Sequence, residues 1–199
     1  MNVVTANGMP NADSVLVFRP AHSVTIHANE RTYAVYDPFK RAPVVSAIDT
    51  TIYFGWTEND TIQVRSLAGK LVCKFILPGE RVQVTKADIE SAVAAYPNAA
   101  RRPEFGATLR RDAPHSWPAF ADIVPDGRGN VWVLKGGPES AAQQWFVFSQ
   151  KGRLIGRAVF EVGVSVKAVR GGRAYTITRG PTGGNYIEVY SVTIPQTVK

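Results

Sequence analysis

Side chains able to bind a ligand gather in four polar segments that separate apolar runs. The segments are "GWTENDT" at 55–61, "KGGPESAAQQ" at 135–144, "RGPTGGN" at 179–185 and the long stretch 79–117. They carry indole, carboxylate, imidazole and cationic groups, which can stack on a ligand, form hydrogen bonds with it or hold a cation. The candidate ligand-binding residues are Trp56, Glu58, Asp60, His115, Trp117, Lys135, Glu139 and Arg179.

The spacing of these groups does not match a common metal or catalytic site. No histidine or further carboxylate follows Glu58 and Asp60 at a recognised ligand spacing, so we predict no metal and no cofactor. No Gly-x-Ser-x-Gly element accompanies His115 and Ser116, and we predict no catalytic residue. In the alternative interpretation, the tryptophans cover strand ends and the carboxylates are solvated turn residues.

The chain is basic, with a formal net charge of +7 and a sequence pI near 9.7. Such a balance favours anionic partners, and the candidate anion-binding residues are Arg101, Arg102, Arg110 and Arg111. The other basic residues of the second half are spread along predicted strands, which is typical of solvated strand edges. Those spread through the last two predicted blades include Lys151, Arg153, Arg157, Lys167, Arg170 and Arg173.

A repeated strand pattern organises the polar segments. "WFVFS" at 145–149, "IEVYS" at 187–191 and "IQVRS" at 62–66 share the form apolar-x-Val-x-Ser, and the first two begin 42 residues apart, at 145 and 187. This period is close to the length of a four-stranded propeller blade. The turn "DGRGNVWV" at 126–133 predicts a hairpin, because its glycines tolerate positive φ and its Val-Trp-Val run favours a strand.

The repeats predict an all-β fold of β-propeller-type, antiparallel, four-stranded blades in one domain, residues 1–199. The blades are expected at approximately 13–42, 43–78, 116–160 and 161–195, with a fourth strand clear only in the second and third.

A helical and loop insertion, 79–115, separates the second and third blades. Thr85 is a predicted N-cap with Asp88 three positions on, and apolar residues at helical spacing predict one amphipathic helix over 85–97. The apolar residues are Ile89, Ala92, Val93 and Tyr96. The polar, Pro-interrupted remainder is predicted to be a loop with at most one further helical turn.

"DGRGNVWV" and "QQWFVFSQKGRLIGRAVF" together resemble the blade signature of six-bladed β-propellers of the NHL and gluconolactonase-like type. The resemblance covers roughly 43–78 and 116–192, and is closest to bacterial six-bladed propeller proteins of unknown function, which are often exported. It implies a partial propeller of about four blades. The sequence departs from the gluconolactonase-like pattern at Phe120, Ala121 and Asp122, where that family has Pro-Asp-Gly, so its metal ligands do not carry over.

These observations favour a non-catalytic β-propeller module that binds an unidentified ligand or protein partner or acts as a scaffold. One alternative, implied by the resemblance, is a metal-assisted hydrolase or lactonase of gluconolactonase type. A further alternative is polyanion or nucleic-acid binding through the basic insertion, since some NHL-type propellers bind RNA. An open ring would also expose blade faces and edges, which predicts self-association. No apolar run of membrane-spanning length and no secretory signal occur in this sequence, and the compartment is left open.

Overall fold

The computed structural model describes residues 21–28, 31–96, 103–180 and 183–193. Within these ranges, thirteen strands form four antiparallel sheets and two helices follow the sixth strand. The predicted all-β class is therefore confirmed. No helix of the described part is long and apolar enough to cross a membrane.

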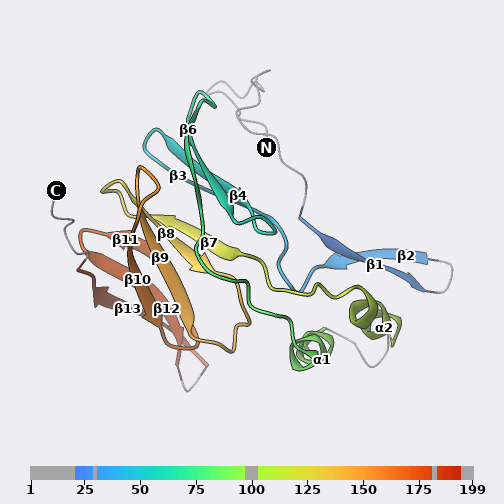
Figure 1. Cartoon of the computed structure of the whole chain (residues 1–199). Coiled ribbons are helices and arrows are strands. Elements are labelled where there is room, and N and C mark those ends of the chain that lie inside the picture. The colour runs from blue at the N-terminus through green and yellow to red at the C-terminus, as the bar shows by residue number, and fades with distance from the viewer. Residues whose placement is uncertain (1–20, 29–30, 97–102, 181–182, 194–199) are drawn as a thin grey trace, which may run out of the picture.

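Three of the sheets are made of consecutive hairpins and follow one another in space (Figure 1). The first contains β3 (Pro43–Ile48), β4 (Thr51–Trp56), β5 (Thr61–Ser66) and β6 (Leu71–Ile76). The second contains β7 (Phe120–Pro125), β8 (Asn130–Lys135), β9 (Gln143–Ser149) and β10 (Leu154–Phe160). The third contains β11 (Val164–Arg170), β12 (Arg173–Arg179) and β13 (Asn185–Ser191). Four-stranded sheets thus lie within the predicted ranges 43–78 and 116–160, and the last range holds three described strands.

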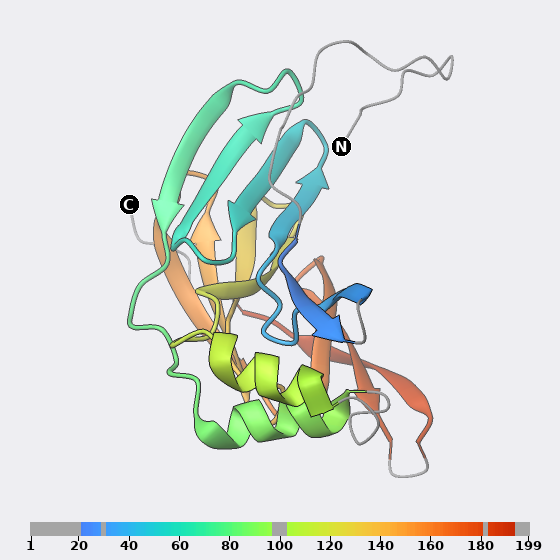
Figure 2. The same cartoon turned by 90° about the vertical axis from the view of Figure 1, so that its right-hand side faces the viewer.

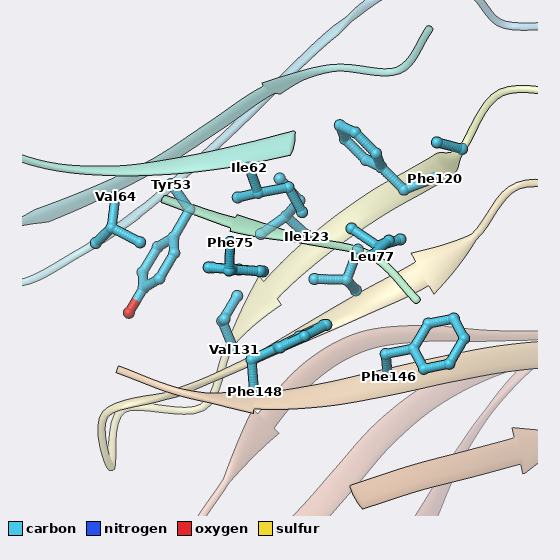
Figure 3. Packing of buried hydrophobic residues seen from close by; sticks show 12 residues of the cluster. Tyr53, Ile62, Val64, Phe75, Leu77, Phe120, Ile123, Val131, Phe146 and Phe148 are labelled. Atoms are coloured by element: carbon cyan, nitrogen blue, oxygen red, sulfur yellow. The ribbon is translucent and has the colours of Figure 1, made fainter. Parts of the chain in front are cut away.

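Two layers of apolar side chains hold the three sheets together. Between the first and second sheets, Tyr53, Ile62 and Val64 face Val131 and Phe148 (Figure 3). A second cluster joins the other face of the β7–β10 sheet to the third sheet, and includes Trp132, Trp145, Val147, Val166 and Ala174. Because side chains alternate between the two faces of a strand, a sheet covered on both sides needs consecutive apolar residues, as in the buried run from Trp145 to Phe148.

The hairpin predicted from "DGRGNVWV" joins β7 to β8. Asp126 is 4% exposed, and its Oδ1 accepts hydrogen bonds from the backbone N–H groups of Arg128 (2.7 Å) and Asn130 (3.0 Å). Gly127 and Gly129 adopt φ values of 74° and 85°, the region that glycine enters without a Cβ penalty. The carboxylate therefore closes a turn whose glycines supply the required backbone conformation.

The fourth sheet has two strands, β1 (Ser23–Ala28) and β2 (Arg31–Tyr36), and it packs beside the helices (Figure 2). Val24 and Ile26 of β1 share an apolar cluster with Phe105 and Leu109 of the insertion. The range 13–42 was predicted to be a blade. In its described part, this range contains only two strands.

The first helix of the insertion, α1 (Lys86–Ala95), agrees closely with the prediction. Thr85 accepts a hydrogen bond from the Asp88 N–H (3.2 Å), and the Asp88 carboxylate accepts one from the Thr85 N–H (2.8 Å). This reciprocal pair is a capping box. Ile89, Ala92 and Val93 face the cluster around Phe105, which confirms the amphipathic face.

The prediction of a loop with at most one helical turn after α1 was wrong. A second helix, α2, spans Pro103–Asp112. Proline is favoured at the first helical position, so Pro103 starts the helix instead of interrupting it. Tertiary burial of Phe105 and Leu109, each 1% exposed, stabilises a segment whose polar composition concealed it.

Candidate functional site

Three of the four predicted polar segments meet at the ends of the first two sheets. The N–H of Ala119, two residues after the stretch 79–117, donates to the Thr57 carbonyl (2.7 Å), which brings the end of this stretch to the β4–β5 loop. The N–H of Gly136 donates to the Ala119 carbonyl (3.2 Å), which adds the β8–β9 loop. Arg179, in the fourth segment, ends β12 and pairs with Asn185 of β13. No hydrogen bond joins it to the other segments among the described residues.

A groove of about 540 Å³, here called the helix groove, lies between the helices, the end of β2 and the β8–β9 loop. Its apolar lining consists of Tyr36, Pro38, Ala92, Ala95, Tyr96, Phe105, Trp117 and Pro138. Its polar lining consists of Lys40, Asp88, Ser91, Glu139 and Ser140. Two of the eight predicted ligand-binding residues, Trp117 and Glu139, are therefore part of one hollow.

The aromatic side of the groove is held by ring packing between elements that are distant in sequence. Tyr96, the C-cap of α1, stacks on Phe105 of α2, with ring centroids 3.7 Å apart. Trp117 meets Phe39 edge to face at 5.3 Å. These contacts order the rings before any ligand arrives, which lowers the entropic cost of binding.

An ion pair between Lys40 and Glu139 is part of the polar lining of the groove. Lys40 is held in place by a tight turn, in which its N–H donates to the Asp37 carbonyl (3.0 Å) and its own φ is 56°. The buried Asp37 carboxylate completes the turn by accepting the Arg41 Nε–H at 2.5 Å. The hydrogen bond from Lys40 lowers the pKa of the Glu139 carboxyl, and their charge attraction adds to this.

Asp88 places a second carboxylate at the groove. Partial burial raises its pKa, but hydrogen bonds from the backbone and side chain of Thr85 outweigh this, so the net pKa is lowered. Trp117 Nε1 is buried and lies outside hydrogen-bond geometry with any described group. The backbone and side-chain bonds from Thr85, each 2.8 Å, fix the Asp88 carboxylate.

Four other predicted residues lie near the β4–β5 loop, outside the groove. Trp56 Nε1 donates to Glu58 (2.7 Å), and His22 lies 3.6 Å from the same carboxylate. Asp60 accepts two hydrogen bonds from Arg81, at 2.6 and 3.0 Å. Lys135 lines a small hollow beside this pair. His115, also predicted, is exposed, and its carbonyl accepts from the Val84 N–H (3.0 Å).

Two of the four predicted anion-binding arginines are already engaged by carboxylates. Arg110 donates to both oxygens of Glu90 (2.8 and 2.7 Å), and Arg111 does the same with Asp112 (2.7 and 2.8 Å). These pairs lower the pKa of Glu90 and Asp112, chiefly through the arginine hydrogen bonds. Arg101 and Arg102 lie outside the described residues. Polyanion binding by this cluster stays a prediction.

A second hollow of about 300 Å³, here called the first-strand groove, lies where the first strands of the three stacked sheets meet. It is lined by segments of β3, β7 and β11, and its polar lining residues are Ser46, Asp122, Lys167 and Arg170. Within the described residues, no group of three His, Cys, Asp or Glu side chains is arranged to hold a metal ion. The gluconolactonase-type alternative stays a prediction without a supporting observation.

The predicted set omitted several groove residues. Asp88 was predicted only as a capping residue. Lys40 was not among the predicted residues, and the positive φ that it adopts in its turn has no signal in the sequence. Tyr36 follows a strand pattern, and Phe105 lay in a segment predicted as a loop. Lys167 and Arg170 were predicted to be solvated strand-edge residues. They are exposed, as expected, but both line the first-strand groove.

No model of a known protein family matches the chain, and no curated protein matches it either.

Proposed function

We propose that this protein is a non-catalytic binding module of β-propeller type, which holds an apolar, aromatic ligand in the helix groove. The observation that carries the proposal is the groove itself, with a volume of about 540 Å³. Small-molecule sites are typically about 300–1,000 Å³ and combine apolar walls with a few placed polar groups. The aromatic rings and the Lys40–Glu139 pair match that composition.

The state of the polar groups supports recognition as their role. Glu139 is paired with Lys40, and Asp88 is bound by Thr85, so each carboxylate already has a fixed partner. The lowered pKa values of both carboxyls favour their charged forms near neutral pH. A ligand would therefore meet an apolar surface beside fixed charges, which suits a mainly apolar, aromatic body.

The propeller part of the proposal is supported by the sheet order. Each of the three stacked sheets runs in chain order from its first strand, and the first strands β3 and β11 both contact β7. Propeller blades likewise direct their first strands toward a common axis, and they pack face to face. On this interpretation, the three sheets form an arc of blades, and the helix groove lies beside the loops at one end of that arc.

A pair of tryptophan substitutions on α1 tests the ligand site. Ala95 lines the groove and is exposed, so Ala95→Trp should fill the hollow without disturbing the fold. Ala94 is the adjacent residue of α1, equally exposed, and does not line the groove, so Ala94→Trp is the matched control.

Ligand-observed NMR with neutral naphthalene-type aromatic compounds should detect saturable binding to the parent chain and to Ala94→Trp, with loss of binding in Ala95→Trp. Urea unfolding of each variant verifies that the fold is retained. No saturable binding to the parent, or equal binding to both variants, would contradict the proposed site.

A further inference from the structure

The first-strand groove carries charge that the stacking of the sheets does not require. Lys167 and Arg170 come from β11, Asp122 comes from β7, and Ser46 comes from β3. Inter-sheet packing uses the apolar neighbours instead, among them Val166 and Val169, which are 1% and 2% exposed. The four polar residues thus line the groove without being part of the apolar core.

Two irregularities in the strands place charged residues in this groove. The register of β11 against β12 shifts between Val166 and Ala168, so Lys167 is the extra residue of a β-bulge. The register of β7 against β8 shifts between Phe120 and Asp122. Bulges redirect side chains and are enriched next to binding sites.

The edge of β7 adds backbone groups to the groove. The Pro125 carbonyl accepts a hydrogen bond from Arg170 Nη1 (2.9 Å), so the backbone of β7 faces β11 across the groove. The Ile123 N–H donates to Asp122 Oδ1 (2.8 Å). Because β3, β7 and β11 are edge strands of their sheets, some of their backbone donors and acceptors point into this space.

The charges in the groove are not balanced. The side chains sum to one positive charge, from Lys167 and Arg170 against Asp122. In the described part of the chain, neither cation forms an ion pair, whereas six other basic side chains do. Asp122 already accepts the Ile123 N–H, which satisfies part of its hydrogen-bonding capacity.

We propose that the first-strand groove binds a small anion, a carboxylate or a phosphate, through Lys167 and Arg170. Arginine offers planar paired donors and lysine a compact charge, and both suit such oxyanions. The volume of about 300 Å³ accommodates a small ligand but not a polymer. The site is separate from the helix groove, so the proposal of an anion site does not depend on the proposed aromatic ligand.

Titration with inorganic phosphate and with succinate, each followed by amide chemical shifts, tests the site. Saturable changes should be confined to the segments that line the groove, residues 45–47, 122–124 and 166–170. Lys167→Gln should weaken binding about tenfold or more, which corresponds to the loss of a charge-assisted contact. Arg173→Gln on β12 is the matched control, because Arg173 is exposed, does not line the groove and loses the same charge. It should change the affinity by less than about twofold.

Lys167 is exposed and makes no described hydrogen bond, so its replacement leaves the fold intact, and urea unfolding verifies this. Binding of either anion at these residues supports the proposal, and the stronger of the two identifies the preferred oxyanion. The proposal is overturned if neither anion saturates the shifts by about 20 mM, a limit that already corresponds to very weak binding. It is equally overturned if Arg173→Gln weakens binding as much as Lys167→Gln, since general charge attraction would then explain the effect.

Discussion

The second and third stacked sheets carry the same strand pattern in very different surroundings. In β9, Trp145 and Val147 are 1% and 3% exposed, because they pack against the third sheet. The equivalent residues of "IEVYS" in β13 are Ile187 and Val189, which are 77% and 52% exposed. Sequence pattern therefore specifies which face of a strand is apolar, and the position of the sheet in the stack decides whether that face is covered.

The exposed face of the third sheet continues the order seen inside the stack. Ile177 is opposite Ile187, and Tyr175 is opposite Val189, so these four side chains share one surface, here called the end face. In the first sheet, Ile62 and Val64 hold the corresponding positions, and both are buried against the second sheet. In the first and second sheets, the surface that corresponds to the end face is therefore covered by the next sheet of the stack.

The largest contrast is expected between a truncation in the covered second sheet and one on the uncovered end face of the third. Phe148 is 2% exposed, and its ring centroid lies 4.5 Å from that of Phe75, so Phe148→Ala removes a ring from the middle of a core. We expect a loss of about 3–5 kcal/mol in the free energy of unfolding. Ile187→Ala should cost less than about 1 kcal/mol, which reflects edge-strand propensity alone. Urea unfolding measures both, and similar losses would contradict the distinction.

A smaller loss of stability is expected at the loop end of the second sheet, where another segment of the chain lies close to its backbone. A Cβ on Gly136 would lie 1.9 Å from the Pro118 carbonyl oxygen, so Gly136→Ala must displace the segment that leads out of the insertion. Overpacking of this kind costs about 1–3 kcal/mol. Gly137→Ala is the control, because the nearest atom, on Val82, would be 3.9 Å away. If thermal or urea unfolding gives the two variants the same stability, the close approach at Gly136 does not require a glycine.

The end face leads to the third prediction, that the protein associates with itself. Light scattering should give a mass above the 21.7 kDa of one chain, rising with concentration. Ile187→Lys should shift the mass toward that of the monomer, since a charge in an apolar contact is costly. Leu67→Lys, at an exposed turn position with 52% exposure, should leave association unchanged. A constant monomeric mass for the parent chain would refute the prediction.

The repeat could be recognised from the sequence because its signal is local. Alternating apolar residues and glycine turns predicted the strands of the stacked sheets, and the Asp126 turn formed as its glycines indicated. The capping residues Thr85 and Asp88 likewise predicted α1. In each case, the residues that carry the signal lie within one turn or strand, so periodicity and turn chemistry suffice.

The features that could not be predicted depend on contacts between distant segments. Phe105 and Leu109 stabilise α2 only through the cluster they share with β1, about 80 residues earlier in the chain. The helix groove requires Lys40 and Glu139 to meet, although they are 99 positions apart. The first-strand groove depends on two bulges, which alternation in the sequence does not reveal.

The smallest effect is expected from Glu188, on the face of β13 opposite to the end face. Its carboxylate accepts hydrogen bonds from the hydroxyls of Thr178 and Tyr190, each at 2.8 Å, and these lower its pKa from the ordinary value of 4.5. A lowered pKa means that the folded state binds fewer protons than the unfolded state below about pH 5. The contribution to stability is therefore present at neutral pH, and it is lost as the pH falls through the pKa of the folded state.

Glu188→Gln removes this titration while keeping the shape of the side chain. The parent should be slightly more stable than the variant at pH 7, and the difference should shrink toward pH 3, as measured by urea unfolding at each pH. Glu139→Gln offers a comparison within the helix groove, where Lys40 lowers the pKa of the carboxyl. Added salt should reduce the stability difference between the parent and Glu139→Gln, and leave the difference for Glu188→Gln unchanged. The reason is that salt screens an ion pair more than it affects hydrogen bonds from neutral hydroxyls. A pH-independent difference for Glu188→Gln would mean that the hydroxyl contacts do not favour the ionised carboxylate in the folded chain.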